Sequence, residues 1–144
     1  MRLYLDTSAL VKLYIEEEGS ALVRGEVDRA VSVATSHIAF VEIRSALSRK
    51  HGLGEVAAGV FHAARASLED DWSCFMVVGI TEAVIREAAR LVDKHRLRAY
   101  DAIHLASAIQ FRRETGEEGS ILFAAWDDNL ANAAKREGFQ LLTR

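Results

Sequence analysis

The feature that most constrains the fold of this chain is an alternation of short apolar runs with longer helical patterns. Short, continuous apolar runs are typical of strands that are covered on both faces of a sheet. The predicted strands are residues 3–5, 31–34, 75–80, 121–125 and 139–142. The predicted helices are residues 9–17, 20–29, 38–51, 56–68, 82–95, 100–114 and 130–137. This alternation predicts an α/β domain with a mostly parallel sheet and helices on both faces.

Glycines mark two of the predicted breaks between elements. Gly138 suits a helix C-terminus before the last strand, and Gly116 and Gly119 mark the loop before the fourth strand. The chain has 144 residues, and 50% of them are hydrophobic, which is enough for one real core. We therefore expect a single domain over residues 1–144.

Charge and cysteine content exclude several classes of protein. A formal net charge of -3 gives no general attraction to nucleic acid or to a membrane, so local features must hold any polyanion. The single Cys74 excludes an internal disulfide and a cysteine-based zinc site, and its apolar neighbours predict that it is buried. No apolar run reaches the roughly 18 residues of a membrane helix, and Asp6 interrupts any signal-peptide core. We expect a cytoplasmic protein with no membrane partner.

Four carboxylates occupy places where an acid is unexpected. Asp6 directly follows the first predicted strand, and Asp127 follows the fourth. Glu42 and Asp101 lie within predicted helices, each among apolar neighbours. In open parallel α/β sheets, binding sites form outside the carboxyl ends of the strands. The four acids are therefore candidates for one site.

Each of these acids also has a purely structural interpretation. Asp6 and Asp127 have the chemistry of helix N-caps, and the two hydroxyls after Asp6 fit the same strand-to-helix turn. Glu42 could lie on the solvent face of its helix, and Asp101 could favour the positive end of a helix dipole. Taken singly, each structural interpretation is the stronger one.

Taken together, the four acids favour a metal site. An acid in an apolar setting is costly unless it is paired or bound to metal, and one divalent cation neutralises several at once. Ligands that are all oxygen indicate Mg²⁺ or Mn²⁺ rather than zinc or copper. Such a site suits phosphoryl chemistry, because the metal neutralises charge on the phosphate and activates water.

The remaining charged residues occur in two settings, at the ends of predicted elements and near the four acids. Acidic runs at element ends, residues 16–18, 69–71 and 117–118, have the pattern of solvated faces. Basic residues near the four acids could hold a nucleic-acid backbone, although for any one of them an ordinary surface charge is the stronger interpretation. These candidates are Lys12, Arg44, Arg49, Lys50, Arg96 and Arg98.

The chain resembles the PIN-domain nucleases, in particular the VapC-type toxins of bacterial and archaeal toxin–antitoxin pairs. The matching stretches are LDTSAL at 5–10, VEIRSAL at 41–47, YDAIHLASA at 100–108 and WDDNLANAAKREGFQLL at 126–142, in the family's order. The resemblance implies a three-layer α/β/α sandwich with a mostly parallel sheet of about five strands. It also implies a Mg²⁺- or Mn²⁺-dependent endoribonuclease that a small antitoxin blocks. By the resemblance, Asp6, Glu42, Asp101 and Asp127 would form the metal and catalytic site.

The fourth motif departs from the family pattern. Ala125 stands where many relatives have Thr or Ser, and a second acid, Asp128, follows Asp127. Position favours Asp127 as the fourth ligand, because Leu130 completes the family's Asp-x-x-Leu pattern. Asp128 stays open as a substitute or an assistant.

Three neighbours of these motifs are possible auxiliaries. Thr7 or Ser8 could place a hydroxyl near the metal or the phosphate, with Ser8 favoured, or either could cap the following helix. His104 lies three residues after Asp101, roughly on the same helix face. A role as a base and a role in packing or hydrogen bonding are both open for His104, and the second is favoured.

Three alternative functions remain at this stage. A phosphatase of the haloacid dehalogenase type would need an Asp where Ser8 stands. The others are a housekeeping PIN nuclease of RNA processing and an inactive PIN module that binds a cation or a protein. Family members are commonly homodimers, and the apolar helices at 20–30 and 56–68 could supply that interface or could simply pack within the monomer.

Overall fold

The computed structural model describes residues 1–116 and 121–142. Its centre is a parallel sheet with the strand order β3-β2-β1-β4-β5. The strands are β1 (Arg2–Leu5), β2 (Ser32–Ser36), β3 (Met76–Val78), β4 (Ile121–Ala124) and β5 (Gln140–Leu141). The prediction of an α/β domain around a parallel sheet of five strands is confirmed.

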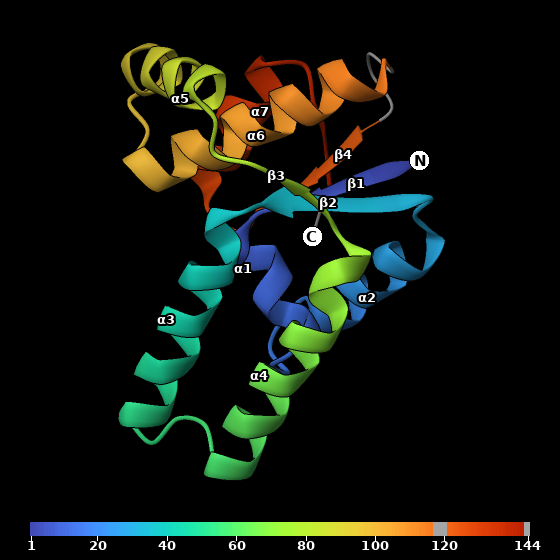
Figure 1. Cartoon of the computed structure of the whole chain (residues 1–144), viewed down its shortest axis with the longest axis vertical. Coiled ribbons are helices and arrows are strands. Elements are labelled where there is room, and N and C mark those ends of the chain that lie inside the picture. The colour runs from blue at the N-terminus through green and yellow to red at the C-terminus, as the bar shows by residue number, and fades with distance from the viewer. Residues whose placement is uncertain (117–120, 143–144) are drawn as a thin grey trace.

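Helices cover both faces of this sheet (Figure 1). On one face lie α5 (Glu82–His95), α6 (Ala99–Thr115) and α7 (Asp128–Arg136). On the other lie α1 (Thr7–Leu10), the 3-10 turn η1 (Val11–Leu13), α2 (Ser20–Arg29), α3 (Ile38–Gly52) and α4 (Ala58–Asp71). The result is a three-layer α/β/α sandwich, as the resemblance implied.

Strand β1 lies in the middle of the sheet and divides the core in two. Tyr4 packs with α5, α6 and α7, whereas Leu3 and Leu5 pack with α1, α3 and α4. All three side chains are fully buried, because alternate residues of a strand point to opposite faces. This explains why the three residues before Asp6 carry no charge.

The order of the strands fixes where a site can form. The chain builds β2 and β3 on one side of β1 and then crosses back to place β4 and β5 on the other. Parallel sheets bind ligands at such a reversal, outside the carboxyl ends of the strands. Asp6 and Asp127 follow the two strands that meet there, and the Asp6 backbone N–H donates to Ala124 O at 3.1 Å.

The first helix differs from its predicted range, 9–17. Helix α1 begins at Thr7 because the side chain of Asp6 caps it, and it ends after one turn at Leu10. The following 3-10 turn ends at Leu13, and Tyr14 follows it. The early start brings Thr7 and Ser8 into the first helical turn, so neither of them is the N-cap.

The predictions for Cys74 and the third strand are wrong in part. Cys74 is exposed and lies in the 3-10 turn η2 (Trp72–Cys74), and β3 begins only at Met76. Because β3 is an edge strand, Met76 keeps 55% of its surface exposed. The apolar run 74–78 is therefore covered less than a central strand would be.

The remaining boundaries agree with the predictions to within a few residues, and two glycines act as expected. Gly116 caps α6 with a φ of 66°, and Gly138 follows α7 with a φ of 87°. Both angles belong to the left-handed region that glycine adopts without strain. Gly119 lies outside the described residues.

Candidate functional site

Four separate elements supply the four predicted acids. Asp6 links β1 to α1, Glu42 lies in α3, Asp101 lies in the first turn of α6, and Asp127 links β4 to α7. The starts of α3 and α6 lie at the same end of the sheet in Figure 1. The acids also affect one another electrostatically: the charge of Asp101 raises the pKa of Asp6, and the charge of Asp127 raises that of Asp101.

Asp6 is both a helix cap and a strongly perturbed acid. Its Oδ1 accepts hydrogen bonds from the backbone N–H of Ala9 at 2.9 Å and from the Ser8 hydroxyl at 2.7 Å. Burial raises the pKa of Asp6 to about 6, although these two bonds and the charge of His104 oppose the shift. Both bonds end on Oδ1, so Oδ2 is left for another partner.

Ser8 joins the first turn of α1 to the segment after β4. Its hydroxyl donates to Asp6 and accepts from the backbone N–H of Trp126 at 2.9 Å. This pair of bonds fixes the position of Asp6 relative to the chain that carries Asp127. Ser8 therefore contacts the carboxylate of Asp6, and its role beside a metal or a phosphate stays a prediction.

Glu42 is half-buried and is held by two side chains from other helices. Its Oε1 accepts from the Thr7 hydroxyl at 2.7 Å and lies 2.7 Å from Nε2 of His104. Burial opposes ionisation, but the hydrogen bonds and the charge of His104, together with the Thr7 bond, keep the pKa of Glu42 below its ordinary value. The solvent-facing interpretation of Glu42 is thus wrong, because this side chain is hydrogen-bonded toward α1 and α6.

Arg98 connects the remaining two acids. Its Nε donates to Asp101 Oδ2 and its Nη2 to Asp127 Oδ2, both at 3.2 Å. Burial still raises the pKa of Asp101 even though Arg98 opposes the shift. Asp127 also caps α7, since its Oδ1 accepts from the backbone N–H of Leu130 at 2.9 Å. Asp128 is exposed in the first turn of α7.

The arrangement has one recurring property. Each of the four acids has at least one carboxylate oxygen that accepts hydrogen bonds from the protein: Oδ1 of Asp6, Oε1 of Glu42, Oδ2 of Asp101 and both oxygens of Asp127. The donor set consists of carboxylate oxygens, which are the ligands that Mg²⁺ and Mn²⁺ prefer. Among residues 1–116 and 121–142, no three His, Cys, Asp or Glu side chains lie close enough together in this structure to hold a metal ion.

Comparisons with known proteins show the family of this chain. The model of the PIN domain matches residues 3–136. Ribonuclease VapC45 of Mycobacterium tuberculosis is 36% identical over 138 residues, which cover 94% of this chain and 90% of that protein. The chain belongs to the PIN-domain family. The resemblance to VapC-type proteins that the motifs indicated is thereby confirmed.

Solved structures share the fold of this PIN domain. A protein of Pyrobaculum aerophilum, PAE2754, has a TM-score of 0.67 at 23% identity, with 98% of this chain and 83% of that chain covered. A toxin–antitoxin complex from Klebsiella pneumoniae has a TM-score of 0.68 at 17% identity, with 98% and 96% covered. The shared fold covers almost the whole of this chain and most of each solved chain.

The basic residues named from the sequence have different surroundings in this PIN domain. Lys12 is buried, pairs with Glu17 at 2.7 Å and lies 4.6 Å from the ring centroid of Trp126. Its ammonium is therefore engaged inside the protein. Glu17 is correspondingly not part of a wholly solvated run, contrary to its predicted setting.

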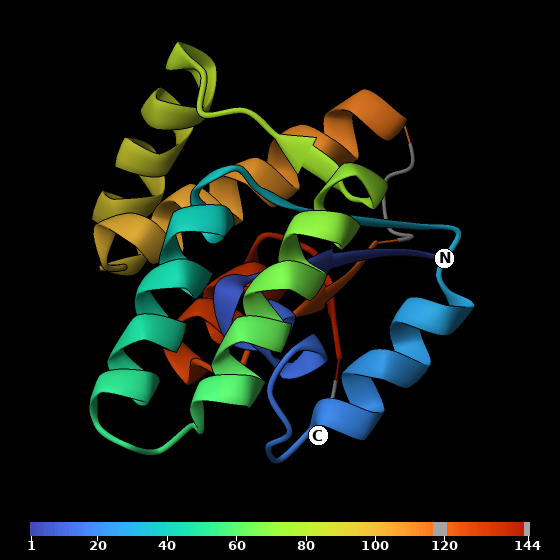
Figure 2. The same cartoon turned by 60° about the horizontal axis from the view of Figure 1, so that its bottom comes forward.

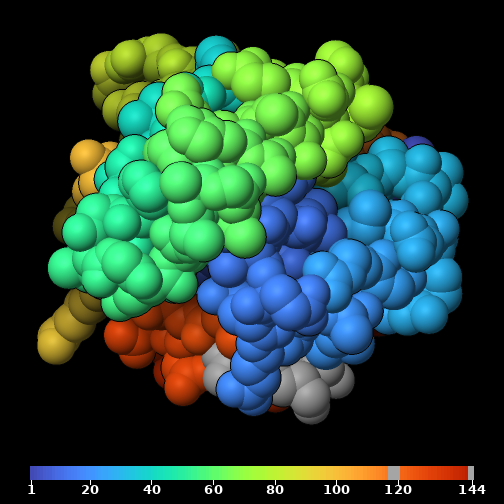
Figure 3. All heavy atoms as spheres, turned by 90° about the horizontal axis from the view of Figure 1, so that it is seen from below, coloured from blue at the N-terminus to red at the C-terminus, as the bar shows by residue number. Residues whose placement is uncertain are grey.

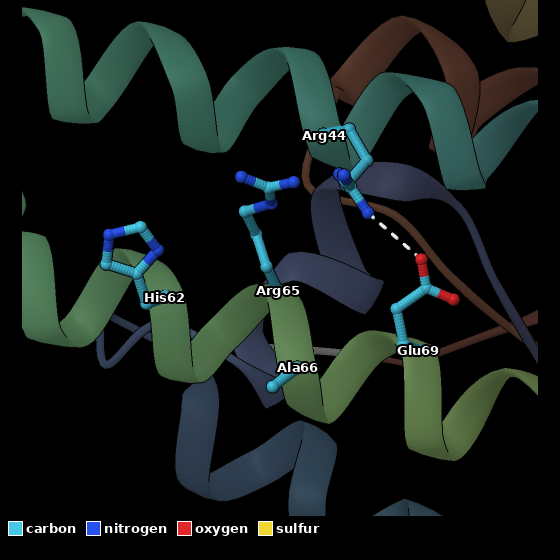
Figure 4. A pocket seen from close by; sticks show the side chains of 5 residues that line it. All are labelled: Arg44, His62, Arg65, Ala66 and Glu69. Carbon is cyan, nitrogen blue, oxygen red and sulfur yellow. Dashed lines mark hydrogen bonds and ion pairs between the residues drawn. The ribbon is translucent and has the colours of Figure 1, made fainter.

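Arg44 lies in a hollow between α3 and α4. The hollow has a volume of about 330 Å³, and Arg44, His62, Arg65, Ala66 and Glu69 line it. The side chains of Arg44 and Arg65 reach into the space between the two helices, and Arg44 pairs with Glu69 at 3.1 Å (Figure 4). The side chain of Arg44 is thus partly exposed at the surface. It belongs to a cluster with Arg65 and Glu69, whereas Glu42 is hydrogen-bonded to Thr7 and His104.

Sequence reasoning missed Tyr4 as part of the site. Its hydroxyl lies 3.1 Å from Nδ1 of His104, inside the core. A buried tyrosine needs a hydrogen-bond partner for its hydroxyl, so a tyrosine between two leucines of a central strand is a usable signal. Arg98 was named as a contact for RNA, but its bridge between two of the acids was not expected.

The structure also bears on the membrane question. Among residues 1–116 and 121–142, none of the helices combines the length and the apolar character that crossing a membrane requires.

Proposed function

We propose that this PIN domain is an endoribonuclease of the VapC type that hydrolyses RNA phosphodiester bonds and acts in the cytoplasm as the toxin of a toxin–antitoxin pair. Support comes from a relative named Ribonuclease VapC45 and from the shared fold of a toxin–antitoxin complex. The observation that carries the proposal is the electrostatic coupling of Asp6 to Asp101 and of Asp101 to Asp127, with Glu42 tied to the same helix as Asp101 through His104.

We propose that these four acids hold Mg²⁺ or Mn²⁺. The donors are hard oxygens, and burial and mutual repulsion hold the pKa of Asp6 and of Asp101 above their ordinary values. A divalent cation relieves that repulsion. When bound, such an ion supplies charge neutralisation on the phosphate and activation of water. Asp127 is the fourth acid in this proposal because it shares Arg98 with Asp101, whereas Asp128 is exposed.

Arg98 has two roles in this proposal. Without metal, its guanidinium neutralises Asp101 and Asp127. Because 78% of its side chain is exposed, it can leave them for solvent without a core rearrangement. Once released, it lies beside the acids and can pair with a flanking RNA phosphate, as arginine commonly does. Arg44 is a further candidate for a backbone contact.

The proposed partners are an RNA, a small cognate antitoxin and a second copy of this chain. Helices α3 and α4 lie side by side, and with α1 and α2 they form one continuous face of the molecule (Figures 2 and 3). Three large apolar side chains on α3, on α4 and at the connection between them are exposed. They are Val41, Leu53 and Val60, with exposed fractions of 68%, 69% and 48%. This face is the proposed place for association, and light scattering with a Val60→Asp variant tests the dimer.

The test of the proposed function is a cleavage assay on purified protein. Structured and single-stranded RNA are incubated with Mg²⁺ or Mn²⁺, with EDTA as the control. We expect cleavage with either metal and none in EDTA. Metal-independent cleavage, or no cleavage of any RNA, would contradict the proposal.

A growth experiment separates a toxin from a housekeeping nuclease or an inactive module. We expect induced expression of the chain to arrest growth, and the Asp6→Asn variant to leave growth unchanged. Sequencing of RNA 5′ ends from the same cultures identifies the cleaved RNA. Equal growth of both strains counts against a toxin.

A further inference from the structure

A chain of hydrogen bonds runs through the core to one of the four acids. Tyr4 of β1 stacks on Phe123 of β4, with ring centroids 5.3 Å apart and an interplanar angle of 11°. The Tyr4 hydroxyl then lies 3.1 Å from Nδ1 of His104 in α6. Nε2 of His104 lies 2.7 Å from Glu42 Oε1 in α3. The chain thus links the half of the core that contains Tyr4 and Phe123 to Glu42.

The hydrogen-bond partners of His104 show that its Nε2 carries a proton. Nε2 faces Glu42 Oε1 and, at 3.0 Å, the oxygen of Thr7, whose own proton goes to Glu42. Both neighbours are acceptors, so Nε2 carries a hydrogen. Nδ1 pairs with the Tyr4 hydroxyl. Burial, and to a smaller extent the charges of Asp6 and Glu42, raise the pKa of Tyr4 well above its ordinary value, which keeps this phenol a donor.

This environment decides between the two roles that the sequence left open for His104. Both ring nitrogens have protein partners, and only 2% of the residue is exposed. A general base must reach the proton that it removes, directly or through one water. His104 has no free nitrogen with which to do so.

We infer that His104 is a positioning residue that holds Glu42 Oε1, with Tyr4 fixing the imidazole, so that Oε2 of Glu42 is presented to the metal. Nε2 of His104 and the Thr7 hydroxyl together satisfy one oxygen of Glu42 and leave the other free. Outer partners that orient a ligand in this way typically change metal affinity by 10–100-fold when they are removed. This inference rests on the proposed function.

The test compares two variants that replace different halves of the imidazole. His104→Gln keeps an N–H donor near the Nε2 position and loses the partner of Tyr4. His104→Asn keeps a group near Nδ1 and loses the donor to Glu42. Mn²⁺ binding to each metal-free protein is measured by calorimetry, RNA cleavage by initial rates, and folding by the urea midpoint. We expect about a 10-fold or greater loss of Mn²⁺ affinity for His104→Asn and less than about a 3-fold loss for His104→Gln.

A matched control lies elsewhere in the chain. His95 is also buried, and its Nε2 lies 2.7 Å from a glutamate, Glu137, outside the site. We expect His95→Asn to lower the urea midpoint and to leave Mn²⁺ affinity unchanged. This control separates the loss of a buried His–Glu pair from the loss of a positioned ligand.

The outcomes are distinguishable. If both His104 variants bind Mn²⁺ as the wild type does, or lose affinity equally, the inference is overturned while the ribonuclease stands. If the wild type neither binds Mn²⁺ nor cleaves RNA, the proposed function fails and the inference with it. A variant that does not fold is recognised by its urea midpoint, and Tyr4→Phe then tests the same chain, with a loss of about 3-fold expected.

Discussion

Two clusters of carboxylates in this PIN domain differ in how far their charge is neutralised. One contains Glu87 and Glu137 and has its own cations, and the other is the candidate site. Glu137, which follows α7, is paired with Lys94 at 2.6 Å and with His95 at 2.7 Å, both from the end of α5. Glu87 is paired with Arg90, with two contacts of 3.0 Å. The hydrogen bonds of Arg90 lower the pKa of Glu87, and Lys94 and His95 lower that of Glu137 against the effect of its burial.

At the candidate site the acids outnumber their cationic partners. Arg98 is shared between Asp101 and Asp127, and burial raises the pKa of Asp6 and of Asp101. A carboxylate cluster that stabilises a fold brings its own cations, as Glu137 does. The surplus of negative charge at the site costs stability and is consistent with an external cation.

The largest expected effect comes from removing a charge at the site. Asp101→Asn keeps the shape of the side chain but weakens metal binding, so we expect RNA cleavage to fall by at least about 100-fold. Initial rates of cleavage with saturating Mn²⁺ measure the effect. Glu137→Gln removes a charge of the same sign from the neutralised cluster, and its cleavage rate should stay within about 2-fold of the wild type. If both variants lose the same fraction of the cleavage rate, the two clusters do not differ in their role.

The second prediction concerns stability without metal. The pKa of Asp6 is about 6 in the folded protein, against an ordinary value of 3.8. Between pH 3.8 and about 6, the folded state therefore binds more protons than the unfolded state does. The free energy of unfolding therefore falls as the pH rises from about 4 to about 6. Asn accepts the same hydrogen bonds as a cap and carries no charge, so Asp6→Asn should avoid that fall and gain about 2 kcal/mol at pH 7.5.

Urea unfolding in EDTA at several pH values measures this gain. The difference between Asp6→Asn and the wild type should grow through the window from pH 4 to 6 and be constant above it. A variant that is less stable than the wild type at pH 7.5 would show that Asp6 acts only as a cap.

The third prediction has the opposite sign. The pKa of Glu137 is lowered, so its contribution to stability is present above its ordinary pKa and is lost as the pH falls through the lowered value. We expect Glu137→Gln to destabilise the protein by about 1 kcal/mol at pH 7.5, because the side chain of its partner Lys94 is half exposed and its ion pair is screened by solvent. The same urea series measures it. A stabilising effect would place Glu137 in the same class as Asp6.

The smallest effect is expected for Arg98. Arg98→Ala removes the internal competitor of the metal, so Mn²⁺ affinity should rise by about 2–5-fold, while RNA affinity should fall by a similar factor. Calorimetry and filter binding measure the two effects. Arg86→Ala is the matched control, because Arg86 is 79% exposed, close to the 78% of Arg98, and pairs with Glu82 on its own helix. A fall in Mn²⁺ affinity for Arg98→Ala would contradict the competition.

Much of the site was predictable, and the limits have physical causes. Asp6, Glu42, Asp101 and Asp127 were recognisable because an acid among apolar residues is costly without a partner. The structural interpretation of Asp6 and Asp127 as N-caps was also correct, since one oxygen of each makes the cap. The partners of Tyr4 and Arg98 were not predictable, because His104 and Asp127 come from other elements of the fold.

The sequence by itself determined the alternation of strands and helices, the five parallel strands and the four acids, because these follow from local patterns of apolar and charged residues. Only the tertiary structure decided which groups hold the oxygens of each acid and how exposed Cys74, Lys12 and Arg98 are. It also decided that His104 faces Tyr4 and Glu42. These properties depend on contacts between residues as far apart as Tyr4 and His104, and crossovers of the chain, rather than any local pattern, bring such residues together.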